Sequence, residues 1–149
     1  RDLPKYISDF ANKDIQFYNV TDIVEFNNKD TLTHAPYGQY IFNEIKEDKV
    51  SDSELEQMKI NTKSQATNYL NKIMTSNGFD IFISVDNSMA GIAAAAHFPA
   101  LTIPMGYRSD GQPSNITFIA KSKNEQLLYN IAYRYEKQSK RRVAPKKYN

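Results

Sequence analysis

Through the first half of the chain, apolar residues recur three and four positions apart, which is the spacing of one face of a helix. The pattern predicts helical segments over residues 3–14, 21–30, 35–48 and 51–78. Thr21 or Asp22 is the expected cap of the second segment. The last segment opens with a capping box, in which Ser51 and Glu54 each satisfy a free backbone amide. It ends at Gly78, which suits the left-handed C-terminal position.

After Gly78 the apolar residues form short, nearly continuous runs that are typical of strands buried on both faces. They predict strands over residues 79–85, 99–106 and 114–121. Pro104 and Gly106 are expected to close the second strand, and the Asp110-Gly111 pair predicts a hairpin turn between the last two.

Two more helices complete the predicted order of elements. The alanines of "GIAAAAH", residues 91–97, favour a short helix that approaches its neighbours closely. Ser122 and Glu125 predict a second capping box, at the start of a closing helix. The apolar face of that helix is expected to carry Leu127, Leu128, Ile131, Ala132 and Tyr135. The predicted fold class is therefore α/β.

Polar residues follow the first predicted strand, on the turn into the alanine-rich helix. Ser88 lies there, but a serine becomes a nucleophile only beside a positioned base, and no lysine is near it in sequence. We expect Ser88 to cap the alanine-rich helix, together with Asp86 or Asn87. Asp86 alone could act as a general base, although a single carboxylate at a strand end is typical of a cap or a turn.

The composition is that of a globular protein of one domain, since 40% of the 149 residues are hydrophobic and 24% are charged. The lack of cysteine excludes disulfides, thiol nucleophiles and thiolate metal sites. His34 and His97 stand far apart in the sequence, so we expect neither a metal site nor a cofactor. Because no apolar run is long enough to cross a membrane and no signal peptide is visible, we expect a cytoplasmic protein without a membrane partner.

Charge is distributed unevenly along the chain. Residues 1–106 carry nine Lys/Arg against fourteen Asp/Glu, whereas residues 107–149 carry ten against three. Much of the basic excess lies in the tail "KQSKRRVAPKKYN". Such a run could bind nucleic acid, but it closes a predicted helix, whose negative end basic residues complement, and it lacks interleaved aromatic platforms for bases. We therefore expect a solvated tail and no nucleic-acid partner.

The residues alone reveal no catalytic motif, because GxSxG, SxxK, HExxH, a P-loop and GxGxxG are all absent. Several segments nevertheless follow the order and spacing of the amidase signature family, which the chain resembles over nearly its whole length. Upstream, "DIVEFNNKD" and "PYGQYIFNEI" resemble the middle region of that family. The downstream matches are Asp80, "PALTIPMG" at 99–106, "DGQP" at 110–113, Phe118 and Ile119 with Glu125, and "LLYNIAYRYE" at 127–136.

The resemblance implies an amidase that hydrolyses the C–N bond of a small-molecule carboxylic amide, with helices packed around a mixed sheet. In this family two serines and a lysine perform the reaction, and they lie in a Gly/Ser-rich N-terminal half. This chain has only five glycines and no GGSS-like run. It also carries Val85 and Asp86 where the family often has a proline. We therefore expect no catalytic residue in this chain and no activity of the chain alone.

The expected chain is the C-terminal part of an amidase domain, with residues 1–78 mainly helical and residues 79–149 forming strands and a closing helix. Its start at Arg1 rather than at a methionine agrees with a truncated fragment. By resemblance, Asp86, Asn87 and Ser88 would form one wall of the substrate pocket, since crevices in open α/β sheets lie at the carboxyl ends of strands.

Unpaired strand edges of a partial domain favour association, so the expected partners are the missing N-terminal half or a second copy of the chain. The alternative function is a non-catalytic scaffold or binding subunit that pairs with a separate chain.

Overall fold

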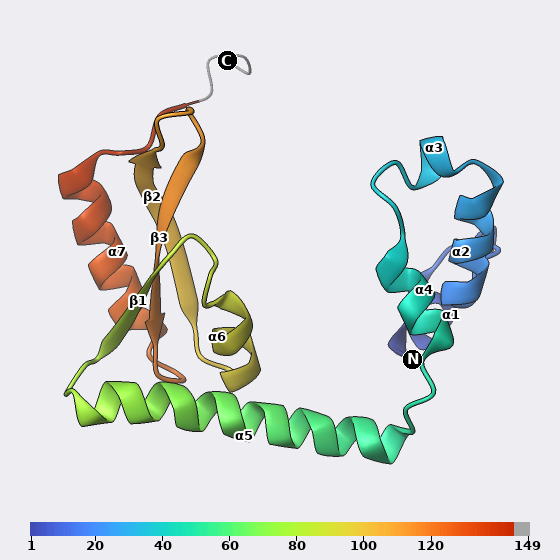
Figure 1. The fold of residues 1–149 in the computed structure, drawn as a ribbon, viewed down its shortest axis with the longest axis horizontal. Coiled ribbons are helices and arrows are strands. Elements are labelled where there is room, and N and C mark those ends of the chain that lie inside the picture. The colour runs from blue at the N-terminus through green and yellow to red at the C-terminus, as the bar shows by residue number, and fades with distance from the viewer. Residues whose placement is uncertain (145–149) are drawn as a thin grey trace. The chain divides into compact units, whose positions relative to one another are not determined.

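The computed structural model describes residues 1–144, so the last five residues of the basic tail lie outside the described residues. The chain divides into two units, one from Arg1 to Ser51 and one from Asp52 onward. The first unit is built from the helices α1 (Asp2–Phe10), α2 (Val20–Lys29), α3 (Thr31–His34) and α4 (Tyr40–Glu47) (Figure 1). The second contains α5 (Asp52–Ser76), β1 (Ile81–Val85), α6 (Ala90–Ala96), β2 (Ala100–Tyr107), β3 (Pro113–Ala120) and α7 (Glu125–Ser139).

Side-chain amides join α2 to the start of α4 in the first unit. Asn27, which is buried on α2, donates from Nδ2 to Oε1 of Gln39 at 3.0 Å. Gln39 in turn donates from Nε2 to Oδ1 of Asn28 at 2.7 Å. Gly38, at φ +82°, lets the chain turn directly before Gln39. These bonds explain why the segments "FNN" and "YGQ" occur together in the sequence, because the side chains of each are the hydrogen-bond partners of the other.

The sheet of the second unit has three strands in the order β1-β3-β2, and both pairings are antiparallel. In the central strand, Thr117 lies opposite Ser84 of β1 and Thr102 of β2. β2 and β3 form a hairpin whose turn contains Gly111 at φ +84°, as the Asp110-Gly111 pair predicts. The predicted fold class is confirmed, although the described strands pair only antiparallel and not in the mixed manner expected.

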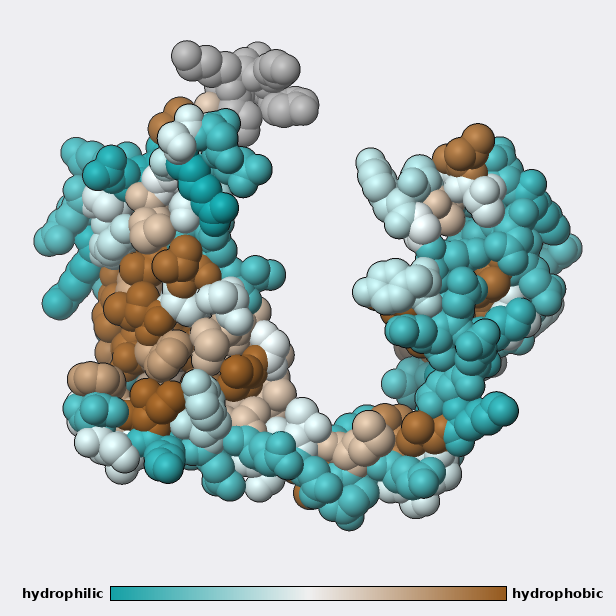
Figure 2. All heavy atoms as spheres, viewed as in Figure 1, coloured by the Kyte–Doolittle hydropathy of each residue, from teal (hydrophilic) through white to brown (hydrophobic). Residues whose placement is uncertain are grey.

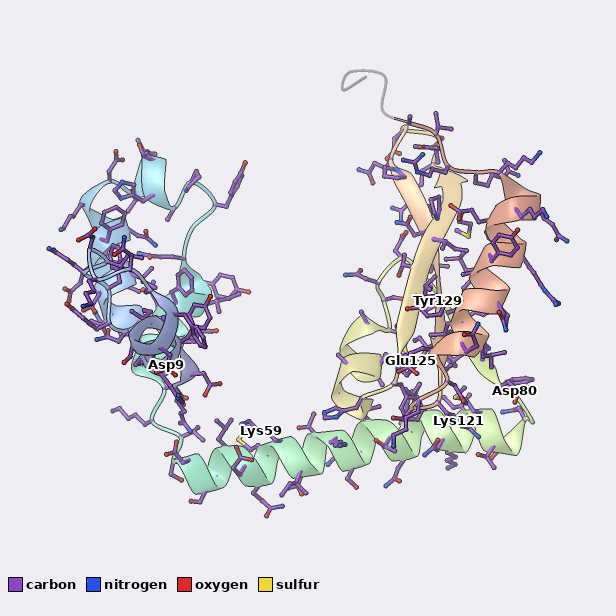
Figure 3. The ribbon with its side chains drawn as sticks, turned by 180° about the vertical axis from the view of Figure 1, so that it is seen from behind. Asp9, Lys59, Asp80, Lys121, Glu125 and Tyr129 are labelled. Atoms are coloured by element: carbon purple, nitrogen blue, oxygen red, sulfur yellow. The ribbon has the colours of Figure 1, made fainter. Side chains whose placement is uncertain are left out.

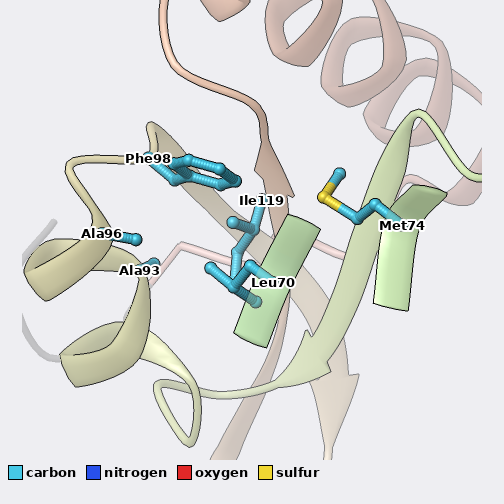
Figure 4. Close-up of a cluster of buried hydrophobic side chains, with 6 residues drawn as sticks. All are labelled: Leu70, Met74, Ala93, Ala96, Phe98 and Ile119. Atoms are coloured by element: carbon cyan, nitrogen blue, oxygen red, sulfur yellow. The ribbon is translucent and has the colours of Figure 1, made fainter. Parts of the chain in front are cut away.

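One face of the sheet is covered by α6 and by the C-terminal half of α5. Leu70 and Met74, one turn apart on α5, have no exposed surface. The small side chains of Ala93 and Ala96 let α6 approach α5 closely, as predicted for the alanine-rich segment. The buried cluster consists of Leu70, Met74, Ala93, Ala96, Phe98 and Ile119 (Figure 4).

The opposite face of the sheet is covered by α7. Leu128 and Ala132, both predicted for the inner face of this helix, are buried against Phe118 of β3. The Phe118 ring also meets Tyr135 edge-on, with the ring centroids 6.0 Å apart. Because successive side chains of a strand point to opposite faces, Phe118 and its neighbour Ile119 tie the central strand to both apolar clusters.

The predicted cap of α2 is wrong. The helix begins at Val20 and is capped by Asn19, whose Oδ1 accepts from the backbone N–H of Asp22 at 3.2 Å. Asp22 accepts in return from the backbone N–H of Asn19 at 3.1 Å, so it is the third residue of a capping box and not the cap. Thr21 lies inside the first turn. The four-residue helix α3 was not predicted, since it is too short to show helical spacing.

The capping box predicted for Ser122 and Glu125 does not form either. α7 begins at Glu125 after Asn124, and no side chain caps it. Lys123 has φ 67°, which turns the chain before the helix starts and leaves Ser122 outside the first turn. Glu125 still lies in that first turn, where its charge complements the positive end of the helix dipole.

Two predictions about the strands are also wrong, because both strands lie at edges of the sheet. The predicted span of β2, residues 99–106, is confirmed to within one residue, but Pro104 lies inside the strand and does not close it, with a register shift between Pro104 and Gly106. An edge strand tolerates proline since its outer N–H needs no partner strand. β1 is not buried on both faces, because the side chains of Ile83 and Val85 are 56% and 53% exposed.

We expect Leu70→Ala to lower the free energy of unfolding of the second unit by about 2–5 kcal/mol, since it leaves a cavity in the cluster around α5. Ile60→Ala is the matched control on the same helix, because Ile60 is 61% exposed; it should change the free energy by less than about 0.5 kcal/mol. Urea unfolding followed by circular dichroism measures both. Equal effects of the two substitutions would contradict the assignment of this core.

Candidate functional site

The turn between β1 and α6 contains the three residues that the sequence predicts for a substrate-pocket wall. Its first residue, Asp86, directly follows the last residue of β1 and has φ 51°. Residues other than glycine rarely adopt this left-handed region, and aspartate is one of the few that tolerate it. The structure therefore places a carboxylate at a sharp change of chain direction, where the sequence shows only a polar turn.

The Asp86 carboxylate accepts hydrogen bonds on both of its oxygens. Nη2 of Arg108 lies 2.7 Å from Oδ2 in an ion pair. The backbone N–H of Asn115 donates to Oδ1 at 2.7 Å, and the Ser114 hydroxyl donates to the same oxygen at 3.4 Å. All three donors belong to the β2–β3 hairpin or its turn, so this one side chain joins the end of β1 to the hairpin.

Backbone and hydroxyl bonds strengthen the same junction. The Asp86 N–H donates to the carbonyl oxygen of Asn115 at 2.8 Å, and the Asp86 carbonyl accepts from the Thr117 hydroxyl. Thr117 Oγ1 also lies 2.7 Å from Oγ1 of Thr102 on β2. A line of polar groups thus crosses the sheet from the end of β1 to its far edge strand.

These donors set the protonation state of the carboxyl. The backbone N–H of Asn115, assisted by the Arg108 guanidinium and the Ser114 hydroxyl, holds the pKa of Asp86 below its ordinary value of 3.8. Asp86 is therefore ionised near neutral pH, with its oxygens already engaged. A general base needs a free lone pair and a pKa near the working pH, so this carboxylate acts as a structural anchor and not as a base.

The next two residues of the turn have different surroundings. Asn87 and Ser88 are exposed, and the Ser88 hydroxyl donates to the carbonyl oxygen of Val85 at 2.9 Å. The predicted capping role of Ser88 is wrong, because α6 begins at Ala90 after Met89 and has no side-chain cap. The bend at Asp86 turns Ser88 back toward the end of β1 instead. Of the three predicted wall residues, Asn87 and Ser88 are accessible, whereas Asp86 holds them in place.

The histidines contribute no acid–base pair to this turn. His97 ends α6 in a left-handed conformation at φ 56°. In the first unit, the His34 ring stacks on Phe26 with centroids 4.2 Å apart, and its Nδ1 lies 3.1 Å from the Phe26 carbonyl oxygen. Across residues 1–144, no three His, Cys, Asp or Glu side chains gather in a group that could hold a metal ion. Within the same range, none of the helices is long and apolar enough to span a membrane.

Sequence reasoning missed the partners of Asp86. Arg108 and Asn115 stand 22 and 29 positions further along the chain, and neither belongs to a motif. Their proximity depends on the register of β3 against both neighbours, which places Ile116 opposite Val85 and Ile103. The Asp110-Gly111 turn was the available signal, since it fixes the hairpin that carries them.

No family model matches the chain. A probable amidase of Arabidopsis thaliana is 27% identical over 84 residues, which make up 56% of this chain and 16% of that protein. An amidase family protein of Bacillus anthracis is 30% identical, and its solved structure superposes with a TM-score of 0.85 over 96% of this chain and 28% of its own. The peptide amidase of Stenotrophomonas maltophilia shares the fold at 20% identity, with a TM-score of 0.72 over 96% of this chain and 32% of its own.

The chain corresponds to the C-terminal part of an amidase signature protein. The predicted resemblance is thereby confirmed, and the chain spans about a third or less of the relatives that it matches. The segments that carry the resemblance are structural in this amidase-like chain. All of "PALTIPMG" except Pro99 lies in the edge strand β2, "DGQ" lies in the hairpin turn before Pro113 of β3, and "LLYNIAYRYE" lies within α7.

We expect Asp86→Asn to destabilise the chain at pH 7, because Arg108 then faces an uncharged amide. The folded pKa of Asp86 lies below 3.8, so the stabilisation by the charged carboxylate is present above that pH and is lost as the pH falls through the folded pKa. The difference between wild type and Asp86→Asn in denaturant unfolding should therefore shrink between pH 7 and pH 3. Glu136→Gln, at an exposed position of α7, is the control and should change little. A difference that does not depend on pH would contradict the anchor role.

Proposed function

We propose that this chain is the scaffold-bearing C-terminal part of an amidase-like hydrolase, which cleaves the C–N bond of a small-molecule carboxylic amide when complete. The similarity to the Bacillus anthracis amidase family protein carries the proposal, since it extends over 96% of this chain at 30% identity. The nucleophile and its base would be supplied by the remaining part of the enzyme, because the sequence has no Gly/Ser-rich run to hold them. Residues 1–78 and 79–149 would belong to one amidase domain.

The described side chains support the proposal that the nucleophile and its base belong to the remaining part of the enzyme. The carboxylate best placed at a strand end, Asp86, is ion-paired with Arg108 and bonded to Asn115. The hydroxyl beside it, Ser88, is bonded to a backbone carbonyl and has no base near it in sequence. A serine without a positioned base is a weak nucleophile, so this turn can shape a pocket but does not supply the reaction.

The proposal is tested by placing the chain in the context of a complete amidase. Residues 1–149 alone should show no hydrolysis of an aryl amide above the buffer rate. A chimera of the Bacillus anthracis protein, with its matching segment replaced by residues 1–149, should hydrolyse an amide that the parent protein hydrolyses. A chimera that folds, as judged by circular dichroism, but is inactive beside an active parent would favour the non-catalytic scaffold alternative. Turnover by the chain alone would contradict the inactive-fragment proposal.

We further expect the turn after β1 to affect substrate binding in that chimera. Asn87→Ala and Ser88→Ala remove exposed polar groups from the proposed pocket wall, so KM should change several-fold while the unfolding midpoint stays close to that of the chimera. Asn68→Ala, at an exposed position of α5, is the matched control. Steady-state kinetics on a series of amides measures the effect. Unchanged KM values across the series would contradict the proposal that Asn87 and Ser88 line the substrate pocket.

A further inference from the structure

The peptide group between Asp86 and Asn87 departs from the hydrogen-bonding pattern of the sheet. Asp86 follows the last residue of β1, and its N–H donates to the carbonyl oxygen of Asn115 on β3 at 2.8 Å. In a regular antiparallel pair, the Asn115 N–H would bond in return to the Asp86 carbonyl. It bonds instead to Oδ1 of the Asp86 side chain at 2.7 Å. The carboxylate thus takes the place of the carbonyl, which is released from the ladder.

Two threonine hydroxyls bind the displaced carbonyl in sequence. The Thr117 hydroxyl donates to the Asp86 carbonyl oxygen. Because a hydroxyl has a single hydrogen, Thr117 is the acceptor in its other bond, in which the oxygens of Thr102 and Thr117 lie 2.7 Å apart. Thr102 is therefore the donor of that bond. The hydrogen bonds run in one direction across the sheet, from Thr102 through Thr117 to the carbonyl of Asp86.

These hydroxyls lie in a largely apolar part of the molecule. Thr117 is 2% exposed, and Figure 2 shows hydrophobic residues gathered over the strands of the second unit. Ser84 lies opposite Thr117 on β1 and is also buried, but its hydroxyl has no partner among the described residues. Burial of a hydroxyl costs free energy unless it is hydrogen-bonded. The Thr117 hydrogen has an acceptor because the Asp86 carbonyl turns toward it.

The bond to Thr117 fixes the direction of the Asn87 N–H. The peptide bonds of the described residues are all trans, and across a planar trans peptide the N–H points opposite to the C=O. Since the Asp86 carbonyl points to Thr117 within the sheet, the Asn87 N–H points away from the sheet, at the carboxyl end of β1. Asp80, before β1, and Lys121, after β3, mark the opposite end of the sheet, next to α5 (Figure 3).

The Asn87 N–H differs from the neighbouring amides of the turn. The Ser88 N–H donates to the carbonyl oxygen of Val85, and the Ala90 N–H donates to that of Asn87. The N–H of Asn87 itself has no acceptor among the described residues. It is therefore a donor whose direction is set by bonds inside the chain. Such a preorganised donor binds an acceptor without a further cost in ordering.

We propose that Thr117 is a positioning residue of the substrate pocket, and that the Asn87 N–H which it orients binds an oxygen atom of the amide substrate. The inference rests on the proposed function, in which residues 86–88 form one wall of the pocket. Every carboxylic amide carries a carbonyl oxygen that accepts hydrogen bonds. A contact made equally in the bound substrate and in the transition state affects KM and leaves kcat unchanged.

Kinetics of the chimera described above test the contact with substrate. Thr117→Val removes the hydroxyl and keeps the shape of the side chain, so KM for an aryl amide should rise several-fold while kcat is retained. Thr117→Ser keeps the hydroxyl and should keep KM. Ser84→Ala is the matched control, because it removes a buried hydroxyl opposite Thr117 that makes no bond; its KM should not change. Unchanged KM in Thr117→Val, or an equal rise in Ser84→Ala, would overturn the proposal.

The direction of the Asn87 N–H is measured in residues 1–149 alone. In a weakly aligned sample of the wild-type chain, the residual dipolar coupling of this N–H should fit the alignment given by the couplings of β1 and β3. The same fit is expected for Ser84→Ala. In Thr117→Val the Asn87 coupling should no longer fit, whereas those of the strands still do, which separates reorientation of one peptide from unfolding. A wild-type coupling that does not fit would overturn the positioning role, as would an unaltered coupling in Thr117→Val.

The two measurements separate the possible failures. An altered coupling beside an unchanged KM would mean that the Asn87 N–H binds another part of the protein, which would overturn the substrate contact. A folded chimera without activity would contradict the proposed function and the substrate contact that rests on it, whereas the couplings decide the role of Thr117 without the chimera.

Discussion

The geometry of the second unit depends on the bonds that the Asp86 carboxylate makes with the β2–β3 hairpin. Three strands in the order β1-β3-β2 have a chain crossing between β1 and β2, and α6 lies in that crossing. The chain must therefore leave β1 sharply, and it does so through a left-handed aspartate. Arg108 and Asn115 of the hairpin bind the Asp86 carboxylate. These bonds fix the direction in which the chain leaves β1, and with it the position of the exposed turn and the start of α6. The apolar clusters then fix the helices on both faces of the sheet.

The two units are stabilised in different ways. The second unit has two apolar clusters, centred on Leu70 and Phe118, which account for most of the buried side chains of the described residues. The first unit buries only Val24 and Asn27 and depends on the hydrogen bonds that the Gln39 side chain makes with Asn27 and Asn28. Large aromatic side chains such as Tyr6, Phe10 and Tyr37 remain more than half exposed there. A unit with so little core is poorly suited to folding alone, which agrees with a chain that matches a limited share of longer amidases.

Local patterns predicted the elements that are governed by local interactions. The helical spacing around Leu70 and Met74, the left-handed Gly78 and the Asp110-Gly111 turn were all readable, because each involves residues close in sequence. The capping box at Ser122 failed, since a single left-handed residue at Lys123 moves the helix start, and residue type does not reveal that conformation. The exposure of Ile83 and Val85 depends on strand order, which no short pattern encodes. For the site, the sequence located the turn at Asp86–Ser88 but not the partners of Asp86, because they meet only through the register of three strands.

The proline in β2 has a consequence for the growth of the sheet. A sheet with two open edges can add strands without limit, and the product of such addition is a fibre. Pro104 and the shift beside it close one of the two edges of this sheet. One residue without an N–H thereby disfavours extension of this sheet on the side of β2.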